Sequence, residues 1–396
     1  MQLRIDGARI WDGESDEASK IPISLGISGS QIEAMEPDLD QGAQEVISCP
    51  SGSVIIPGLI DAHVHLDLDP TIMKPDGQFE ASRHDRDLRM MARAKAMVTA
   101  GITTARDLGA GEWREVLLRD AISRQECLGP RLLCAGQPLT ISEGHCHFWG
   151  GVADDAKARE EVIRRQLDHE VDWIKIMATG GVFTPGSRVD GAQFSESEIA
   201  QVVSLAKQAG RPVAAHCHGK EGIRNAARAG VRTIEHCSFA GRAGFGVDYD
   251  ASVVRDIARQ ESWVSPTING NWQHRIHKNG EPTVFYQRTR AVLAGLKEAG
   301  VPLIASTDAG IPGVHHHGLW SGLVAMAHYA GLSPRQALCS ATSESARALG
   351  LEKTCGVLRP GLSADLIVLA GDPLNDLGQL AQPLWVVAQG RVVRRP

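Results

Sequence analysis

The sequence predicts an α/β protein, a (β/α)8 TIM barrel with a small β domain formed from both chain termini. Short apolar runs alternate with segments of helical period through most of the chain, which is typical of βα units around a parallel sheet. The 396 residues leave room for a barrel of about 250 residues and a smaller unit. Hydrophobic residues make up 43% and charged residues 22%, an ordinary globular composition that argues against disorder.

Eight short apolar runs are the expected barrel strands, and the amphipathic stretches between them are the expected helices. Several of these stretches close with Ala-Gly, a typical helix stop before a strand. Ser195 and Glu198 have the spacing of a capping box. The strands are expected at 54–67, 101–109, 130–140, 172–181, 212–219, 233–239, 263–270 and 301–310, and helices at 88–100, 112–127, 155–171, 196–210, 251–260 and 288–300. A doubly wound sheet is the alternative arrangement.

The two ends of the chain depart from this alternation. Residues 1–53 and 355–396 read as short strands and turns. Because neither end alone is large enough to bury a core, we expect the two to pair into one small β-sandwich-like domain. The barrel is then expected over 54–354.

Charge, hydropathy and cysteine usage exclude several classes of protein. The 41 basic and 47 acidic residues give a net charge of −6, which argues against a basic nucleic-acid binder. We find neither an apolar run of about 18 residues nor a secretory leader. The eight cysteines contain no CxxC pair, which favours reduced thiols in the cytoplasm. We therefore expect a cytoplasmic protein whose partner is a small molecule, neither nucleic acid nor membrane.

Potential metal ligands gather where the expected strands end, and barrel enzymes carry their chemistry at that rim. Each has an ordinary explanation: an HxH pair is often not a ligand, an Asp after a strand often caps a helix, and a buried lysine is often ion-paired. Their recurrence at corresponding strand ends instead predicts a metal site, because i and i+2 side chains of one strand share a face. These residues are His63, His65, Lys175, His216, His236 and Asp308.

The motifs around these positions resemble the amidohydrolase superfamily. They are PGLIDAHVH at 57–65, KIMATGG at 175–181, IEH at 234–236 and LRPGLSADLIVL at 358–369. The sequences of these motifs are similar to those of the imidazolonepropionase-like and Xaa-Pro or Xaa-Arg dipeptidase branch, which has a carboxylated lysine. The resemblance covers nearly the whole chain. It identifies the metal motifs and leaves the substrate open.

The resemblance implies two divalent metal ions, usually zinc. His63, His65 and Asp308 would hold the more buried ion, and His216 and His236 the more exposed one. Lys175, N6-carboxylated by CO2, would bridge the two ions. This is physically coherent, since a carbamate replaces a cation by an oxygen-donor anion between two dications. Imidazole and carboxylate ligands suit zinc, with manganese or cobalt tolerated.

The implied reaction is hydrolysis of an amide C–N bond in a small substrate such as a dipeptide or N-acyl amino acid. A metal-bridging hydroxide would attack the carbonyl, with Asp308 as general base and then general acid. His218 would donate a hydrogen bond to the developing oxyanion. Many dipeptidase-like relatives have tyrosine at that place, so the resemblance does not carry their substrates over to this chain. Members of the family are often multimeric, so a homo-oligomer is consistent with it.

Substrate contacts are expected from loops at the rim. His145 and His147 lie in a loop that resembles one lining the family's substrate pocket, and His145 is the stronger candidate for a substrate carboxylate or carbonyl. Arg188 lies in a Gly- and Pro-containing loop over the barrel mouth, where it could bind a carboxylate. Trp272 and Trp149 offer flat apolar walls. The tract 315–317 of three histidines is expected at the entrance or at a helix start.

Two other readings remain open at this stage. The first is a mononuclear amidohydrolase acting on a cyclic amide or heterocycle, like an imidazolonepropionase or a deaminase. Mononuclear branches generally lack the lysine of the fourth strand, so Lys175 favours the binuclear enzyme. The second is a non-catalytic assembly protein on the same barrel, which the complete set of ligands disfavours.

Overall fold

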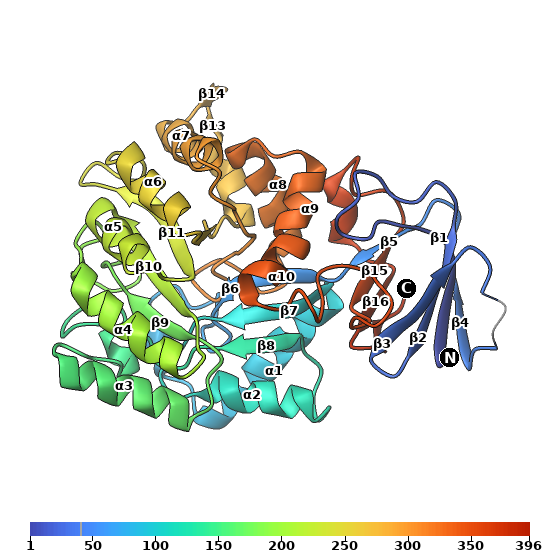
Figure 1. Cartoon of the computed structure of the whole chain (residues 1–396), viewed down its shortest axis with the longest axis horizontal. Coiled ribbons are helices and arrows are strands. Elements are labelled where there is room, and N and C mark those ends of the chain that lie inside the picture. The colour runs from blue at the N-terminus through green and yellow to red at the C-terminus, as the bar shows by residue number, and fades with distance from the viewer. Residues whose placement is uncertain (40–41) are drawn as a thin grey trace.

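The computed structural model describes residues 1–39 and 42–396 and confirms the barrel with a terminal β domain. Parallel barrel strands form two arcs, one of three strands and one of four (Figure 1). The first arc is β6 (Leu59–Val64), β7 (Ile102–Asp107) and β8 (Arg131–Cys134). The second is β9 (Ile174–Met177), β10 (Val213–Gly219), β11 (Thr233–Ala240) and β12 (Trp263–Ser265).

Irregular segments join the two arcs into a closed barrel. Leu139, beyond β8, forms a parallel bridge with Ile176 of β9. The eighth expected strand, 301–310, is not a regular strand, yet it fills the last gap. Its Leu303 bridges Val264 of β12, and its Ala309 bridges Val64 of β6. Closure brings the residues at both ends of the strand series together at one rim.

Helices surround the barrel, as Figure 1 shows. Six of them fall on the stretches expected to be helical, and Ser195 with Glu198 forms the expected capping box of α4. Four more lie outside those stretches. The helices are α1 (Arg83–Thr99), α2 (Arg114–Ser123), α3 (Ala156–Asp168), α4 (Glu196–Gln208), α5 (Lys220–Arg228), α6 (Ala251–Arg259), α7 (Val284–Glu298), α8 (Leu319–Ala330), α9 (Pro334–Ser340) and α10 (Ser343–Leu349).

The terminal domain is one sheet to which both chain ends contribute strands. Its order is β17-β16-β15-β5-β1-β2-β3, with β4 also pairing with β1. Aliphatic side chains of the two termini, among them Ile5, Leu25 and Leu366, share a separate core. The strands are β1 (Leu3–Ile10), β2 (Ile23–Ser28), β3 (Gln31–Glu36), β4 (Glu45–Ser48), β5 (Val54–Pro57), β15 (Leu366–Leu369), β16 (Trp385–Ala388) and β17 (Arg391–Arg394).

The single strand expected over 54–67 is in fact two strands with different partners. β5 pairs with β15 of the terminal sheet, whereas β6 pairs with β7 of the barrel. The change falls at Gly58, whose N–H donates to Asp365 O, while the next N–H, of Leu59, donates to Gly101 O. A side chain at Gly58 would collide with Thr103, so glycine permits this close approach. The sequence did not show this change of partner, because both strands are buried and their residues form one continuous apolar run.

Four short 3-10 helices and one hairpin complete the described part of the chain. Two of them, η2 (His147–Trp149) and η3 (Gly270–Arg275), lie in loops after barrel strands. The others are η1 (Pro75–Phe79) and η4 (Leu377–Ala381), and the hairpin is β13 (His277–Lys278) with β14 (Glu281–Pro282). Within the described ranges, no helix has both the length and the apolar character needed to cross a membrane.

Candidate metal centre

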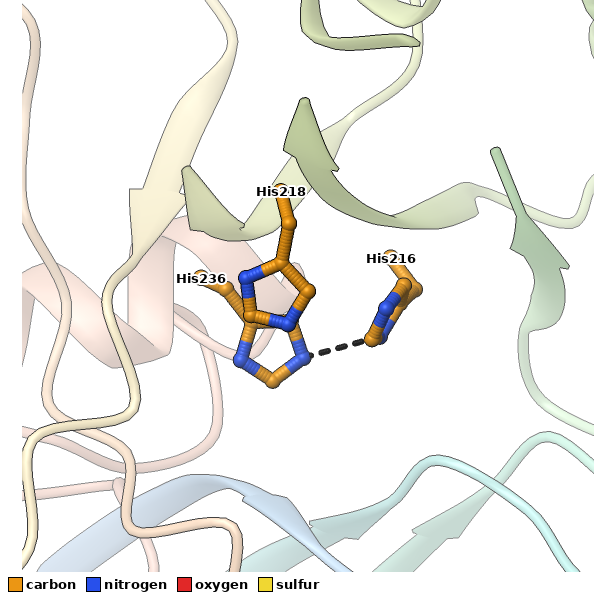
Figure 2. Close-up of side chains that lie close together, drawn as sticks. All are labelled: His216, His218 and His236. Carbon is orange, nitrogen blue, oxygen red and sulfur yellow. Dashed lines mark hydrogen bonds between the residues drawn. The ribbon is translucent and has the colours of Figure 1, made fainter. Parts of the chain in front are cut away.

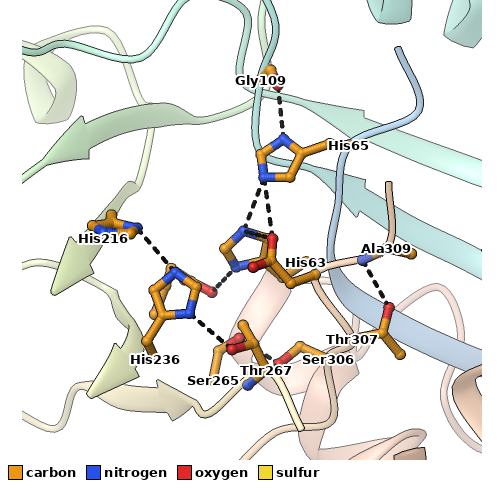
Figure 3. A network of polar contacts seen from close by, with 12 residues as sticks. His63, His65, Gly109, His216, His236, Ser265, Thr267, Ser306, Thr307 and Ala309 are labelled. Atoms are coloured by element: carbon orange, nitrogen blue, oxygen red, sulfur yellow. Dashed lines mark hydrogen bonds and ion pairs between the residues drawn. The ribbon is translucent and has the colours of Figure 1, made fainter. Parts of the chain in front are cut away.

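The first cluster of potential ligands is His63, His65 and Asp308. The Nε2 atoms of both histidines lie 3.3 and 3.4 Å from Asp308 Oδ1, and 3.2 Å from each other. Figure 3 shows how the rings converge. Strand geometry explains this, since His63 and His65 are i and i+2 on β6 and its end, and Asp308 N–H donates to His63 O on the adjoining segment. Two imidazoles and a carboxylate focused on one point form a suitable donor set for a divalent cation.

Both histidines of this cluster are held in orientation by a hydrogen bond at Nδ1. His63 Nδ1 lies 2.9 Å from Glu235 Oε2, and His65 Nδ1 lies 2.8 Å from the carbonyl oxygen of Gly109. An acceptor at Nδ1 makes that nitrogen the N–H donor and leaves Nε2 with a free lone pair. The two rings are therefore held in the tautomer that a metal needs.

Glu235 belongs to a buried network that sequence reasoning missed. Arg106 donates to its Oε1 at 2.9 Å, and Thr233 Oγ1 donates to the same oxygen at 2.6 Å. Although burial raises the pKa of Glu235, the nearby Arg106 guanidinium holds it below its usual value. The carboxylate is thus ionised, which favours its bond to His63. The signal available in the sequence was the pair of charged residues, Arg106 and Glu235, inside apolar strands.

The second cluster consists of three histidines, His216, His218 and His236 (Figure 2). His236 Nε2 lies 2.9 Å from His216 Nδ1, and the rings of His218 and His236 stack at 4.4 Å. Burial lowers the pKa of all three, that of His218 to about 4. They are therefore neutral at pH 7, which is the ligating form of imidazole. The sequence assigned His216 and His236 to this group and reserved His218 for the oxyanion, whereas the geometry brings all three within reach of one ion.

Hydroxyl groups orient this second cluster. Thr267 Oγ1 lies 2.8 Å from His236 Nδ1, and Ser238 Oγ lies 2.9 Å from His218 Nδ1. A hydroxyl both donates and accepts, so it fixes no tautomer by itself. The three histidines bring no carboxylate to the cluster, and this is its main chemical difference from the first.

Lys175 lines the same cavity as both clusters and is almost wholly buried. Its Nζ has no hydrogen-bond partner among the described residues. Burial lowers its pKa to about 8, with Glu235 opposing the effect. A buried amine without a partner is costly, so its presence at a strand end requires an explanation. A group added to Nζ, or an ion bound beside it, would provide one.

Backbone conformation brings His236 into the site. Its φ is 64°, and that of Asp308 is 60°, both in the left-handed region that side chains rarely adopt. Glu235 points into the barrel toward Arg106, so regular alternation would turn His236 outward. The left-handed turn instead directs both side chains inward. Such backbone strain is concentrated at functional sites.

The two clusters open into one cavity of about 470 Å³. Among the expected substrate contacts, His145 and Trp272 line it, as does Trp149. The ring of His145 lies 4.5 Å from that of His216, and its buried Nδ1 has no partner among the described residues. Most of the remaining wall is apolar. It includes residues that sequence reasoning did not find because they lie in loops: Met73, Val182, Phe183, Phe245, Arg275 and Ile311.

Other expected contacts lie apart from this cavity. His147 Nδ1 is bonded to Gly144 O at 2.9 Å, and Arg188 is exposed and paired with Asp190 at 3.1 Å. Neither is among the described residues that line the cavity. In the 315–317 tract, His316 is buried with Nε2 3.0 Å from His65 O, so this residue supports the backbone of a ligand strand. Cys217 and Cys237 are buried in the hydrophobic core, as packing residues would be.

The chain belongs to the amidohydrolase family, which matches residues 54–393. An ochratoxinase from Aspergillus niger is 26% identical over 357 residues, which cover 83% of this chain and 73% of that protein. An imidazolonepropionase from Polaromonas sp. (strain JS666) is 25% identical over 388 residues, or 86% of this chain and 81% of that one. The crystal structure of a Xaa-Pro dipeptidase with bound methionine superposes with a TM-score of 0.87 at 27% identity, covering 99% of each chain.

Family, fold and donor sets agree on the class of protein. The chain is a hydrolase that acts on carbon–nitrogen bonds, and it resembles the dipeptidases of its family. The family is generally metal-dependent, and the two groups of potential ligands fit that dependence. The resemblance inferred from the sequence motifs is thereby confirmed.

Proposed function

We propose that this protein is a binuclear metal-dependent hydrolase that cleaves the amide bond of a small substrate such as a dipeptide or N-acyl amino acid. The supporting observation is that two ligand clusters face one cavity and adjoin each other, with the rings of His63 and His236 at 5.3 Å. The ligand set of imidazoles and a carboxylate best suits zinc. The ochratoxinase and dipeptidase relatives support an amide as the bond cleaved.

Lys175 completes the donor set as a carbamate. Its lowered pKa of about 8 leaves part of the amine neutral at pH 7, and the neutral amine is the form that attacks CO2. The new N–C bond forms with loss of one proton, and the product is an anion with two oxygen donors. This anion supplies the negative charge that the three-histidine cluster lacks, and it removes the unpaired amine from the barrel interior.

The protein's own groups divide the proton transfers between them. When bound, two divalent ions would supply a hydroxide nucleophile at neutral pH and polarise the scissile carbonyl. Asp308 is ionised, because the adjacent His63 and His65 lower its pKa although burial raises it. It therefore starts as the base that accepts the proton of the attacking water, and it then delivers that proton to the leaving nitrogen.

His218 and His145 act on the substrate's polar atoms. If Ser238 donates to Nδ1 of His218, its Nε2–H is free to donate to the developing oxyanion. His145, whose Nδ1 has no protein partner among the described residues, contacts a substrate carboxylate or carbonyl. Both imidazoles are neutral at pH 7, since burial lowers the pKa of His145 to about 3 and that of His218 to about 4.

A second candidate is a mononuclear enzyme acting on a cyclic amide, in keeping with the imidazolonepropionase relative. Metal counting distinguishes the two. Protein purified without chelator, supplied with zinc and bicarbonate, is analysed for metal and screened against dipeptides, N-acyl amino acids, lactams and carbamates. We expect two ions per chain and hydrolysis of linear amides. One ion per chain, with turnover of cyclic substrates alone, would replace the first candidate by the second.

A further inference from the structure

A ladder of aromatic rings in successive contact leads from the three-histidine cluster to an arginine that lines the same cavity. The His218 ring stacks on Phe245 at 5.2 Å with an interplanar angle of 19°, and Phe245 lies 6.0 Å from Phe285. The Arg275 guanidinium lies over the Phe285 ring, 3.8 Å from its centre. Phe245 and Arg275 line the cavity together with His218. Two phenylalanine rings thus connect the arginine to the histidine cluster through successive contacts.

Arg275 is held in place but not neutralised. It ends η3, just before the β13–β14 hairpin at the edge of the barrel beside α7 (Figure 1). Phe285 packs against Trp272 at 5.0 Å and Tyr329 at 6.1 Å, so the ring beneath the guanidinium is itself fixed. Within the described part of the chain, the guanidinium has neither a carboxylate nor another hydrogen-bond acceptor. Stacking uses its face and leaves the in-plane N–H donors free for a ligand.

Charge makes Arg275 distinctive among the residues of the cavity wall. The lining residues that carry an ordinarily cationic side chain, histidines aside, are Lys175 and Arg275. Lys175 is buried in the barrel beside the ligand clusters, whereas Arg275 is exposed at the mouth. An anionic group on a substrate therefore meets one strong charge outside the reaction centre. The apolar wall between favours an apolar connection.

We propose that Arg275 is a specificity-determining residue that binds a carboxylate remote from the scissile amide, on a substrate whose intervening part is apolar. The inference rests on the proposed amide hydrolysis. His63, His65 and His216 are buried, whereas Arg275 lines the same cavity from an exposed position. An α-carboxylate lies within about 4 Å of the scissile carbonyl carbon, so we place the exposed guanidinium beyond its reach. The acid that Arg275 selects is consequently separated from the amide by a longer spacer, on either the amine half or the acyl half of the substrate.

The test uses N-benzoyl derivatives of glycine, β-alanine, 4-aminobutyrate and 6-aminohexanoate, each as the acid and as the neutral carboxamide. A second series, anilides of succinate and adipate, places the acid on the acyl half. The kcat/KM ratio of acid to carboxamide is measured for the wild type, Arg275→Met and Arg275→Lys. Arg290→Met is the matched control, because Arg290 also lies near an aromatic ring, that of Tyr286, but outside the cavity lining.

In one of the two series, we expect the substrates with longer spacers to show a preference for the acid. Their acid-to-carboxamide ratio of kcat/KM should be about 10- to 100-fold higher in the wild type than in Arg275→Met, which is the size of one charge-assisted hydrogen bond. The change should fall on KM, while kcat for the carboxamides stays the same. Arg275→Lys should be intermediate, and Arg290→Met should match the wild type. An equal ratio in the wild type and Arg275→Met, or a loss of the ratio in Arg188→Met instead, would overturn the proposal.

Failure of the proposed function has a different signature. If no amide of either series is cleaved by any protein, the binding of the same acids is measured by calorimetry. Weaker binding to Arg275→Met than to the wild type would support the carboxylate site even without hydrolysis. Equal binding to both proteins would reject it.

Discussion

The two ligand clusters lie side by side in one cavity but are built differently. In the cluster of His63, His65 and Asp308, one of the potential ligands is a carboxylate, and the Nδ1 atoms of both imidazoles face a carboxylate or a carbonyl oxygen. In the three-histidine cluster, no side chain carries charge, and two of the Nδ1 atoms face hydroxyls. The side chains of the first cluster are held in place by these partners. The second cluster contains no anion, and in the proposed binuclear enzyme the carbamate of Lys175 would supply one.

The largest effect is expected for Lys175→Ala, which removes the proposed bridge between the two clusters. The three-histidine cluster should lose its ion, the Asp308 cluster should keep its own, and kcat/KM should fall by more than about 10⁴-fold, beyond the loss of one general base. Metal analysis and steady-state kinetics measure both effects. Short carboxylates added to the variant should restore part of the activity. Two ions per chain at full rate would show that the carbamate is unnecessary.

Asp308→Asn separates metal binding from proton transfer. The amide keeps an oxygen donor, so at least one ion should remain, but it cannot accept the proton of the attacking water. We expect kcat to fall by about 10²- to 10⁴-fold. Metal content and kcat are measured on the same preparation. Undiminished turnover in the variant would assign the general base to another group.

Glu235→Gln tests the preorganisation of the first cluster. The His63 N–H keeps an acceptor but loses its charge assistance, so affinity for the first ion should fall by about 10- to 100-fold. Thr267→Val removes the hydroxyl that faces His236 Nδ1, and it should alter only the affinity for the second ion. Zinc titration of the metal-free proteins measures both. Because Glu235→Gln leaves Arg106 buried without its carboxylate, the double variant Arg106→Met with Glu235→Gln checks that the loss does not come from misfolding.

The smallest effect is a pH dependence of the metal-free protein. Burial lowers the pKa of His218 from 6.5 to about 4, so the unfolded chain binds a proton that the folded chain does not between these values. Stability should therefore fall as the pH drops through this window. His218→Gln should reduce proton uptake on unfolding by about one. Urea unfolding in chelator from pH 7 to pH 4 measures this, and unchanged pH dependence would mean that His218 is already charged.

The sequence by itself determined the barrel, the contribution of both termini to one small β domain, and the candidate ligands. These follow from local rules: apolar runs alternate with helical periods, and i and i+2 residues of a strand share a face. His63 with His65 and His216 with His218 are recognisable in this way, because each pair lies along one strand or its end. The resemblance of the motifs added the family.

Only the tertiary structure decided which other residues join the candidate ligands in the site. Period-two alternation allows Glu235 or His236 to face inward, and the left-handed backbone at His236 admits both. The bond from Glu235 to His63 joins residues 172 positions apart, and the two phenylalanines of the aromatic ladder come from separate loop and helix segments. Such contacts depend on barrel closure and loop packing. Neither leaves a periodic trace along the chain, because no local rule relates the residues involved.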